Sequence, residues 1–206
     1  HAAFDGTWND QSNLPLSGNE VVTSTARISN MIKDAGDPNV VSQYQPGVGT
    51  NGIVSQYVAG SILPTEEVRA QAMNMHAVLV RQANEWHQAN PDIPLDINIT
   101  AMAFSRGNPA MVMFGHILNE QGIPDPSSAY TVEVPSGVGD GDAFVTETRY
   151  SRNLVEPGVG LSMIAMEPVA AGVWTNGNNF LSPNVTRVDV VYADDEHRAS
   201  FSPMAF

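Results

Sequence analysis

The chain of 206 residues has the size of one domain and is long enough to bury a sizeable hydrophobic core. It contains no cysteine, which excludes disulfides and thiolate metal sites. Its formal net charge of -13 argues against a nucleic-acid partner, and the apolar runs are shorter than the roughly 20 residues of a membrane span. No signal peptide is visible in this sequence, which starts at a histidine and not at a methionine.

Apolar periodicity and turn residues predict alternating strands and helices. A short strand, Ala2-Ala3-Phe4, runs into the turn Asp5-Gly6-Thr7. Further strands are expected at 40–44, 97–104, 161–169 and 185–192, with helices at 19–33, 64–89 and from about 107 to 122. Residues 124–160, rich in Pro, Gly, Ser and charge, are expected to form a loop or lid insertion. This order predicts one α/β domain over 1–206, with a mostly parallel central sheet and helices on both faces.

The stretch from Ile97 to His116 carries the strongest functional signal. A buried-type strand reverses at Ser105-Arg106-Gly107 and continues as an apolar helix, which is the pattern of a nucleophile elbow. Such a turn needs small residues two before and two after the serine, and here they are Ala103 and Gly107. The alternative is an ordinary strand-to-helix turn of a non-catalytic α/β protein.

Five segments together resemble a family of α/β-hydrolase domains that includes type VI secretion lipase effectors, which are antibacterial phospholipases. They lie in the family's order and span most of the chain: Phe4-Asp-Gly-Thr-Trp-Asn9, Tyr44-Gln-Pro-Gly-Val-Gly-Thr50, Phe104-Ser-Arg-Gly107, Ala165-Met-Glu-Pro-Val169 and Asp195-Glu-His-Arg198. The resemblance implies an α/β-hydrolase-like layered fold and serine hydrolase activity on carboxylic esters.

The resemblance also assigns roles by position. Ser105 is the expected nucleophile, and Glu167 is the expected acid of the triad, where the family usually has aspartate. Asp5 and Thr7 are expected beside the elbow, and the backbone N–H groups of Arg106 and of the Gly6-Thr7 turn are expected to stabilise the oxyanion. The Arg106 side chain is expected to pair with Asp5 or Glu167, or to meet a phosphate head group.

The base histidine has two interpretations. His197 completes the chain order Ser, acid, His of α/β-hydrolases. The family's own histidine, however, lies in a His-Ser-Asp-x-Gly-Gly motif beyond the Asp-Glu-x-Arg segment, and this sequence does not contain that motif. The first strand is also short before Phe4, so compared with the family both ends of the chain are expected to be truncated. A histidine outside this sequence is the other interpretation.

The expected function is hydrolysis of a lipid or other carboxylic ester by a lipase or phospholipase, without a cofactor. Asp140-Gly-Asp142 matches a calcium loop too incompletely to predict a metal site. An immunity or secretion-machinery protein is the expected partner, and type VI delivery to a target-cell periplasm, or the cytoplasm, is the expected location. Two alternatives stay open: an inactive hydrolase-fold scaffold, and an esterase of small esters or polysaccharides.

Overall fold

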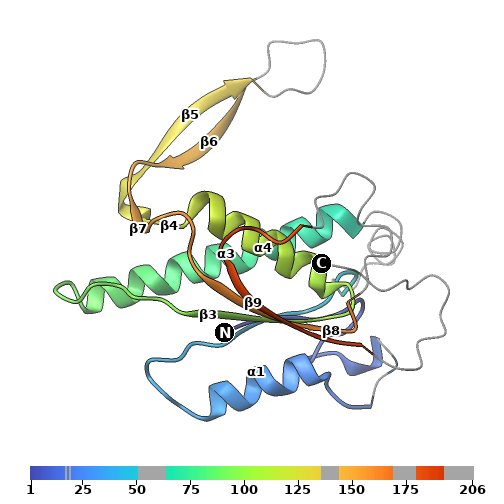
Figure 1. The fold of residues 1–206 in the computed structure, drawn as a ribbon. Coiled ribbons are helices and arrows are strands. Elements are labelled where there is room, and N and C mark those ends of the chain that lie inside the picture. The colour runs from blue at the N-terminus through green and yellow to red at the C-terminus, as the bar shows by residue number, and fades with distance from the viewer. Residues whose placement is uncertain (17, 19, 51–63, 136–143, 169–179, 193–206) are drawn as a thin grey trace.

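A five-stranded sheet forms the centre of the molecule (Figure 1). The computed structural model describes residues 1–16, 18, 20–50, 64–135, 144–168 and 180–192. The strands, in spatial order, are β2 (Gln43–Gln45), β1 (Ala2–Phe4), β3 (Ile99–Phe104), β8 (Leu161–Met166) and β9 (Val185–Val191). Every neighbouring pair is parallel. The predicted parallel sheet is therefore confirmed.

Helices cover both faces of this sheet, as predicted (Figure 1). Helix α1 (Ser24–Asp34) lies on one face, and α3 (Pro64–Ala89) and α4 (Gly107–Gln121) lie on the other. Helix α1 begins later than predicted because Thr23 caps it, accepting a hydrogen bond from the Ala26 N–H at 3.1 Å. A short 3-10 helix, Leu14–Leu16, precedes α1.

Small side chains on the central strands let helix α4 pack closely against the sheet. Phe4, Ala103 and Ala165 are paired across β1, β3 and β8, and all three are fully buried. The Phe4 ring meets Phe114 of α4 with 5.7 Å between ring centroids. This contact fixes α4 over the middle of the sheet.

The strand order reverses between β1 and β3. From β1 the chain crosses through α1 to β2 on one side, and then through α3 to β3 on the other side. In open α/β sheets, ligands bind at such a reversal, in the crevice outside the carboxyl ends of the strands. Asp5 directly follows the carboxyl end of β1, and Ser105 directly follows the carboxyl end of β3.

Residues 123–135 and 144–155 form strands that the sequence did not predict. Strand β4 (Ile123–Pro124) pairs with β7 (Asn153–Val155), and after a 3-10 turn at Pro126–Ser128, β5 (Ala129–Pro135) pairs with β6 (Phe144–Tyr150) as an antiparallel hairpin. Because α4 runs back from Ser105, this region leaves the body at the amino-end edge of the sheet and projects outward (Figure 1). Its described residues include strands where the sequence predicted a loop, and a lid role for 124–160 stays a prediction. The Asp140-Gly-Asp142 segment lies outside the described residues.

None of the helices in the described ranges is long and apolar enough to cross a bilayer.

His76 joins the middle of α3 to the end of α4, and its titration gives a test of this packing. Its side chain is 7% exposed, and its Nε2 bonds the Gly122 carbonyl at 2.8 Å. Burial lowers the pKa of His76 below 6.5, outweighing the opposite effect of that hydrogen bond. Below pH 6.5 the unfolded chain therefore takes up a proton before the folded chain does, so this stability is present above pH 6.5 and is lost as the pH falls.

We expect the free energy of unfolding to decrease from pH 7 to pH 5, and to decrease less in a His76→Gln variant. Glutamine keeps an N–H donor for the Gly122 carbonyl but cannot take up the proton. Urea denaturation across this pH range measures the difference, with His87→Gln on the same helix as the control. A wild-type protein and a His76→Gln variant with the same pH dependence would contradict the packing.

Candidate active site

Ser105 stands at the turn between β3 and α4, as the elbow pattern predicts. Its φ of 51° lies in the left-handed region, which non-glycine residues rarely adopt. Its backbone N–H donates to the Met166 carbonyl at the end of β8, at 3.0 Å, and the residue is half-buried. The turn is therefore strained and is held in place from the neighbouring strand.

Three glycines bring the ends of β1, β2 and β3 into backbone contact around this turn. A Cβ on Gly107 would come 2.5 Å from the Phe4 carbonyl oxygen, and one on Gly6 would come 2.9 Å from the Ser105 Cβ. A Cβ on Gly47 would overlap the Gly6 carbonyl. No side chain fits at these positions without movement of the backbone, so the glycines determine how closely Ser105 approaches β1.

Asn108 fastens the turn to the adjacent strand. It is fully buried, and its Nδ2 donates to the Ser105 carbonyl at 2.8 Å and to the Met166 carbonyl at 3.1 Å. Each of these carbonyls also accepts a backbone N–H, from Asn108 and from Ser105 respectively, so the amide adds a second hydrogen bond to both and ties the turn to β8. Sequence reasoning missed this residue, although a buried amide in the first turn of an apolar helix was a usable signal.

The Asp5 carboxylate stabilises the turn after β1 by accepting three hydrogen bonds. Its carboxylate accepts hydrogen bonds from the Thr23 hydroxyl at 2.6 Å, the Tyr44 hydroxyl at 2.8 Å and the Gly6 N–H at 2.8 Å. Burial raises the pKa of Asp5, although the three hydrogen bonds oppose the shift. Its closeness to the elbow agrees with the prediction, but its described partners come from α1, β2 and its own turn.

The hydrogen bonds of Asp5 reduce the number of backbone N–H groups that could bind an oxyanion beside Ser105. Because the Gly6 N–H is engaged by Asp5, the remaining donor of the predicted Gly6-Thr7 turn is the Thr7 N–H. The Thr7 hydroxyl is buried, and within the described ranges it makes no hydrogen bond. The Arg106 N–H, at the N-cap of α4, is the other donor position beside Ser105.

The Arg106 side chain is associated with Glu67, a residue that the sequence did not single out. Arg106 is 7% exposed; burial lowers its pKa, and the negative charge of Glu67 opposes that shift. The Glu67 carboxylate also accepts a hydrogen bond from the Gly49 N–H at 2.8 Å. Glu67, whose charge acts on Arg106, is on α3 and is neither of the two expected partners, Asp5 and Glu167.

Glu167 follows β8 directly, on the strand beside the one that ends at Ser105. Its φ is 43°, a second left-handed non-glycine residue at this edge, and its N–H donates to the Val191 carbonyl at 2.7 Å. Its side chain is half-buried and makes no hydrogen bond to a described residue, including Ser105. Glu167 therefore follows the strand that pairs with β3, the strand before Ser105, and its role as the triad acid stays a prediction.

The histidines in the described ranges all lie away from the elbow. His1 begins β1 at the opposite edge of the sheet, and His76 bonds the far end of α4, about 22 Å along a helix of 15 residues. His116 bonds the Phe180 carbonyl, and His87 is in the last turn of α3. His197 lies outside the described residues. The described ranges also hold no group of three or more His, Asp or Glu side chains suited to a metal ion.

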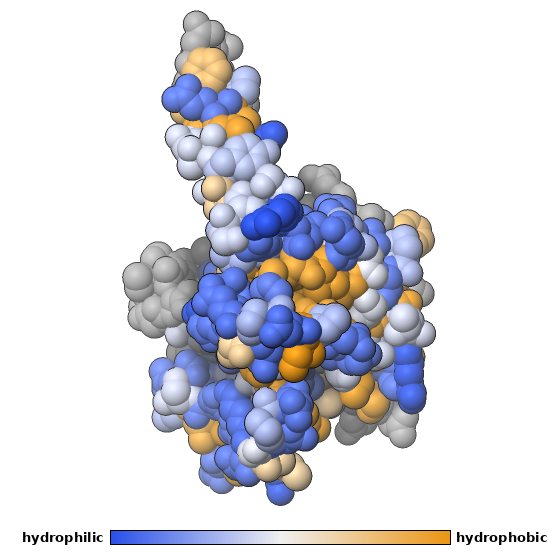
Figure 2. All heavy atoms as spheres, turned by 90° about the vertical axis from the view of Figure 1, so that its left-hand side faces the viewer, coloured by the Kyte–Doolittle hydropathy of each residue, from blue (hydrophilic) through white to orange (hydrophobic). Residues whose placement is uncertain are grey.

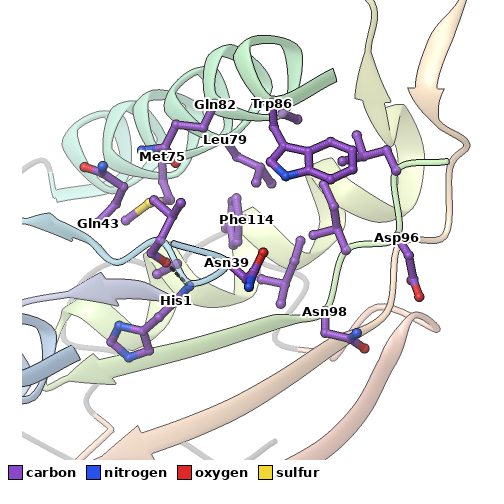
Figure 3. A pocket seen from close by; sticks show the side chains of 16 residues that line it. His1, Asn39, Gln43, Met75, Leu79, Gln82, Trp86, Asp96, Asn98 and Phe114 are labelled. Carbon is purple, nitrogen blue, oxygen red and sulfur yellow. Dashed lines mark hydrogen bonds between the residues drawn. The ribbon is translucent and has the colours of Figure 1, made fainter. Parts of the chain in front are cut away.

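A cavity of about 250 Å³ lies at the amino-end edge of the sheet, far from Ser105. Figure 3 shows Met75, Leu79 and Trp86 of α3 facing Phe114 of α4 across it, with His1 at the start of β1. It contains none of the predicted site residues. The cavity therefore does not bear on the predicted site at Ser105.

The left-handed conformation of Ser105 can be measured as strain. We expect a Ser105→Gly variant to unfold with a free energy about 1 kcal/mol higher than a Ser105→Ala variant, because glycine adopts positive φ without a steric penalty. Equilibrium denaturation of both variants checks this difference. An equal or lower stability of the glycine variant would show that the turn has an ordinary backbone conformation.

The contact between α4 and β1 gives a second prediction. Gly107→Ala should lower the free energy of unfolding by about 2–3 kcal/mol, because its methyl group would overlap the Phe4 and Asp5 carbonyls. Gly160→Ala is the matched control, since its nearest atom would be 3.9 Å away. Similar stabilities for the two variants would contradict the close packing.

Comparison of the chain with models of known families, with curated proteins and with solved structures finds no match. The candidate site is therefore defined by its own geometry.

Proposed function

We propose that the chain is a serine hydrolase that acts on carboxylic esters, with Ser105 as the nucleophile. The observation that carries the proposal is the left-handed Ser105 at the tip of the β3–α4 turn, beside the reversal of strand order. Residues with a strained backbone cluster at functional sites, and they persist only where the surrounding structure holds them in place. Here the glycine contacts and Asn108 supply that support.

The proposed reaction is acyl transfer in two steps. Ser105 Oγ attacks the ester carbonyl while its proton passes to a histidine base, and the alcohol leaves with that proton. Water then attacks the acyl-serine and gives a proton to the same base. The base passes this proton to Ser105 Oγ as the acyl–oxygen bond breaks, so the carboxylic acid is released and the serine hydroxyl is regenerated. The N–H groups of Arg106 and Thr7 are the proposed oxyanion donors, each contributing roughly 3 kcal/mol in the transition state.

The finer assignments belong to the same proposal. Glu167 would orient the base, which is His197 or a histidine outside this sequence. A phospholipid or other lipid ester as substrate, an immunity or secretion-machinery partner and type VI delivery rest on the family resemblance alone. In this scheme Arg106 acts through its backbone, because its side chain is buried near Glu67.

A second candidate is a non-catalytic scaffold that keeps the elbow as architecture. One observation favours it: within the described ranges, no histidine side chain hydrogen-bonds Ser105, and the Glu167 carboxylate makes no hydrogen bond. A serine without a base is a weak nucleophile.

A Ser105→Ala variant separates the two candidates. We expect the wild-type protein to hydrolyse nitrophenyl esters and to be labelled by a fluorophosphonate, and the variant to lose both activities while keeping its circular dichroism spectrum. Ser128→Ala, at the base of the hairpin, is the control and should retain both. A folded wild-type protein that is neither labelled nor active would favour the scaffold. If the wild-type protein is active, a panel of esters of different acyl length defines its substrate.

A further inference from the structure

The β5–β6 hairpin stands apart from the body of the molecule (Figures 1 and 2). It forms a separate sheet of two strands, and all seven residues of β6 are exposed. Three of them are large and apolar: Phe144 is 61% exposed, Val145 47% and Tyr150 42%. A two-stranded hairpin is marginally stable alone, so an exposed hairpin of this composition is suited to a further contact.

The hydrogen-bond pattern shows which edge of the hairpin is open. The Ser151 N–H donates to the Ser128 carbonyl at 3.2 Å, and this pair continues the β5–β6 register. Because hydrogen-bonded and non-hydrogen-bonded pairs alternate, alternate residues of each strand direct their backbone groups outward. On β6 these are Phe144, Thr146, Thr148 and Tyr150; on β5 they are Ala129, Thr131, Glu133 and Pro135.

The outer edges of β5 and β6 differ in their ability to form hydrogen bonds with another strand. Pro135 has no N–H and interrupts the outer edge of β5, as proline commonly does on strands that must not pair. Strand β6, Phe-Val-Thr-Glu-Thr-Arg-Tyr, contains no proline, glycine or lysine, and its residues favour extended structure. The outer edge of β6 is therefore the one that can accept another strand.

We propose that this edge pairs with β6 of a second copy of the chain, antiparallel and centred on Thr148. In this register Thr148 faces Thr148 of the second copy, and Thr146 faces Tyr150, so residues with outward backbone groups meet one another. Glu147 then lies opposite Arg149 of the second copy, and Arg149 lies opposite Glu147. The strand is complementary to itself in both hydrogen bonding and charge.

The charges also select this register and this occupant. The hydrogen-bond pattern would also allow a pair centred on Thr146, but that register places Glu147 opposite Val145 and loses both pairs of opposite charge. The pair already present within one strand, Arg149 Nη2 to Glu147 Oε2 at 3.2 Å, shows that these side chains lie on the same face. A formal net charge of -13 opposes binding to an anionic membrane. Two seven-residue strands bury a small area, so we expect a dissociation constant on the order of 10–100 μM.

A cysteine cross-link tests the proposed centre, because the chain has no cysteine of its own. Hydrogen-bonded antiparallel pairs have Cα atoms about 5.5 Å apart, which suits a disulfide. A Thr148→Cys variant of the full chain should form a covalent dimer under mild oxidation. Thr131→Cys, directly across the hairpin on the β5 edge, is the matched control and should stay monomeric. Equal cross-linking of both variants, or none in Thr148→Cys, would overturn the proposal.

Charge exchange tests the register independently by sedimentation velocity from 1 to 500 μM. Arg149→Glu should weaken the dimer at least tenfold, and the double variant Glu147→Arg/Arg149→Glu should restore it. Arg187→Glu is the control, because Arg187 and Asp189 form a similar exposed pair on β9, 2.8 Å apart. A wild-type protein that is monomeric throughout, a dimer lost through Arg187→Glu instead, or binding of the hairpin to phosphatidylglycerol vesicles in place of self-association would each overturn the proposal. These outcomes are independent of ester hydrolysis.

Discussion

The close backbone contact between the ends of β1, β2 and β3 is the constraint on which the site depends. Gly6, Gly47 and Gly107 remove the side chains that would otherwise separate the β1 turn, the loop after β2 and the start of α4. Helix α4 can therefore begin directly beside the Phe4 carbonyl, and the chain must reverse within the two residues between β3 and α4, Ser105 and Arg106. The left-handed φ of Ser105 is the local consequence of the packing.

Buried polar groups stabilise this arrangement from both sides. Asp5 links the β1 turn to α1 and β2, while Asn108 links the Ser105 turn to β8. Glu67 joins the loop after β2 to the region of Arg106. Each of these groups satisfies donors or acceptors at strand ends, where the regular ladder of hydrogen bonds stops. The rigid support on both sides is what a nucleophile at this position would require.

The sequence predicted the parts of the fold that periodicity and turn residues determine. The buried strands, the three long helices and the elbow at Ser105 could be recognised because apolar spacing and small residues act locally. The hairpin at β5 and β6 was missed although Thr131-Val-Glu-Val134 on β5 alternates polar and apolar residues. Strand β6 has no such alternation, and the surrounding sequence, rich in Pro, Gly and Ser, favoured a loop. Asn108 and Glu67 were missed because their roles depend on contacts between strand ends that are distant in the chain. The edge of the sheet at which this hairpin leaves the body follows from the direction of α4, which only the topology shows.

The central claim is that this packing presents the Ser105 hydroxyl to a substrate beside two backbone donors. A crystal structure of the protein after treatment with a nitrophenyl phosphonate tests it most directly. The account predicts a phosphorus–oxygen bond to Ser105 Oγ, with the phosphoryl oxygen within hydrogen-bonding distance of the Arg106 and Thr7 N–H groups. An unmodified Ser105, or an adduct whose phosphoryl oxygen points away from both donors, would contradict it.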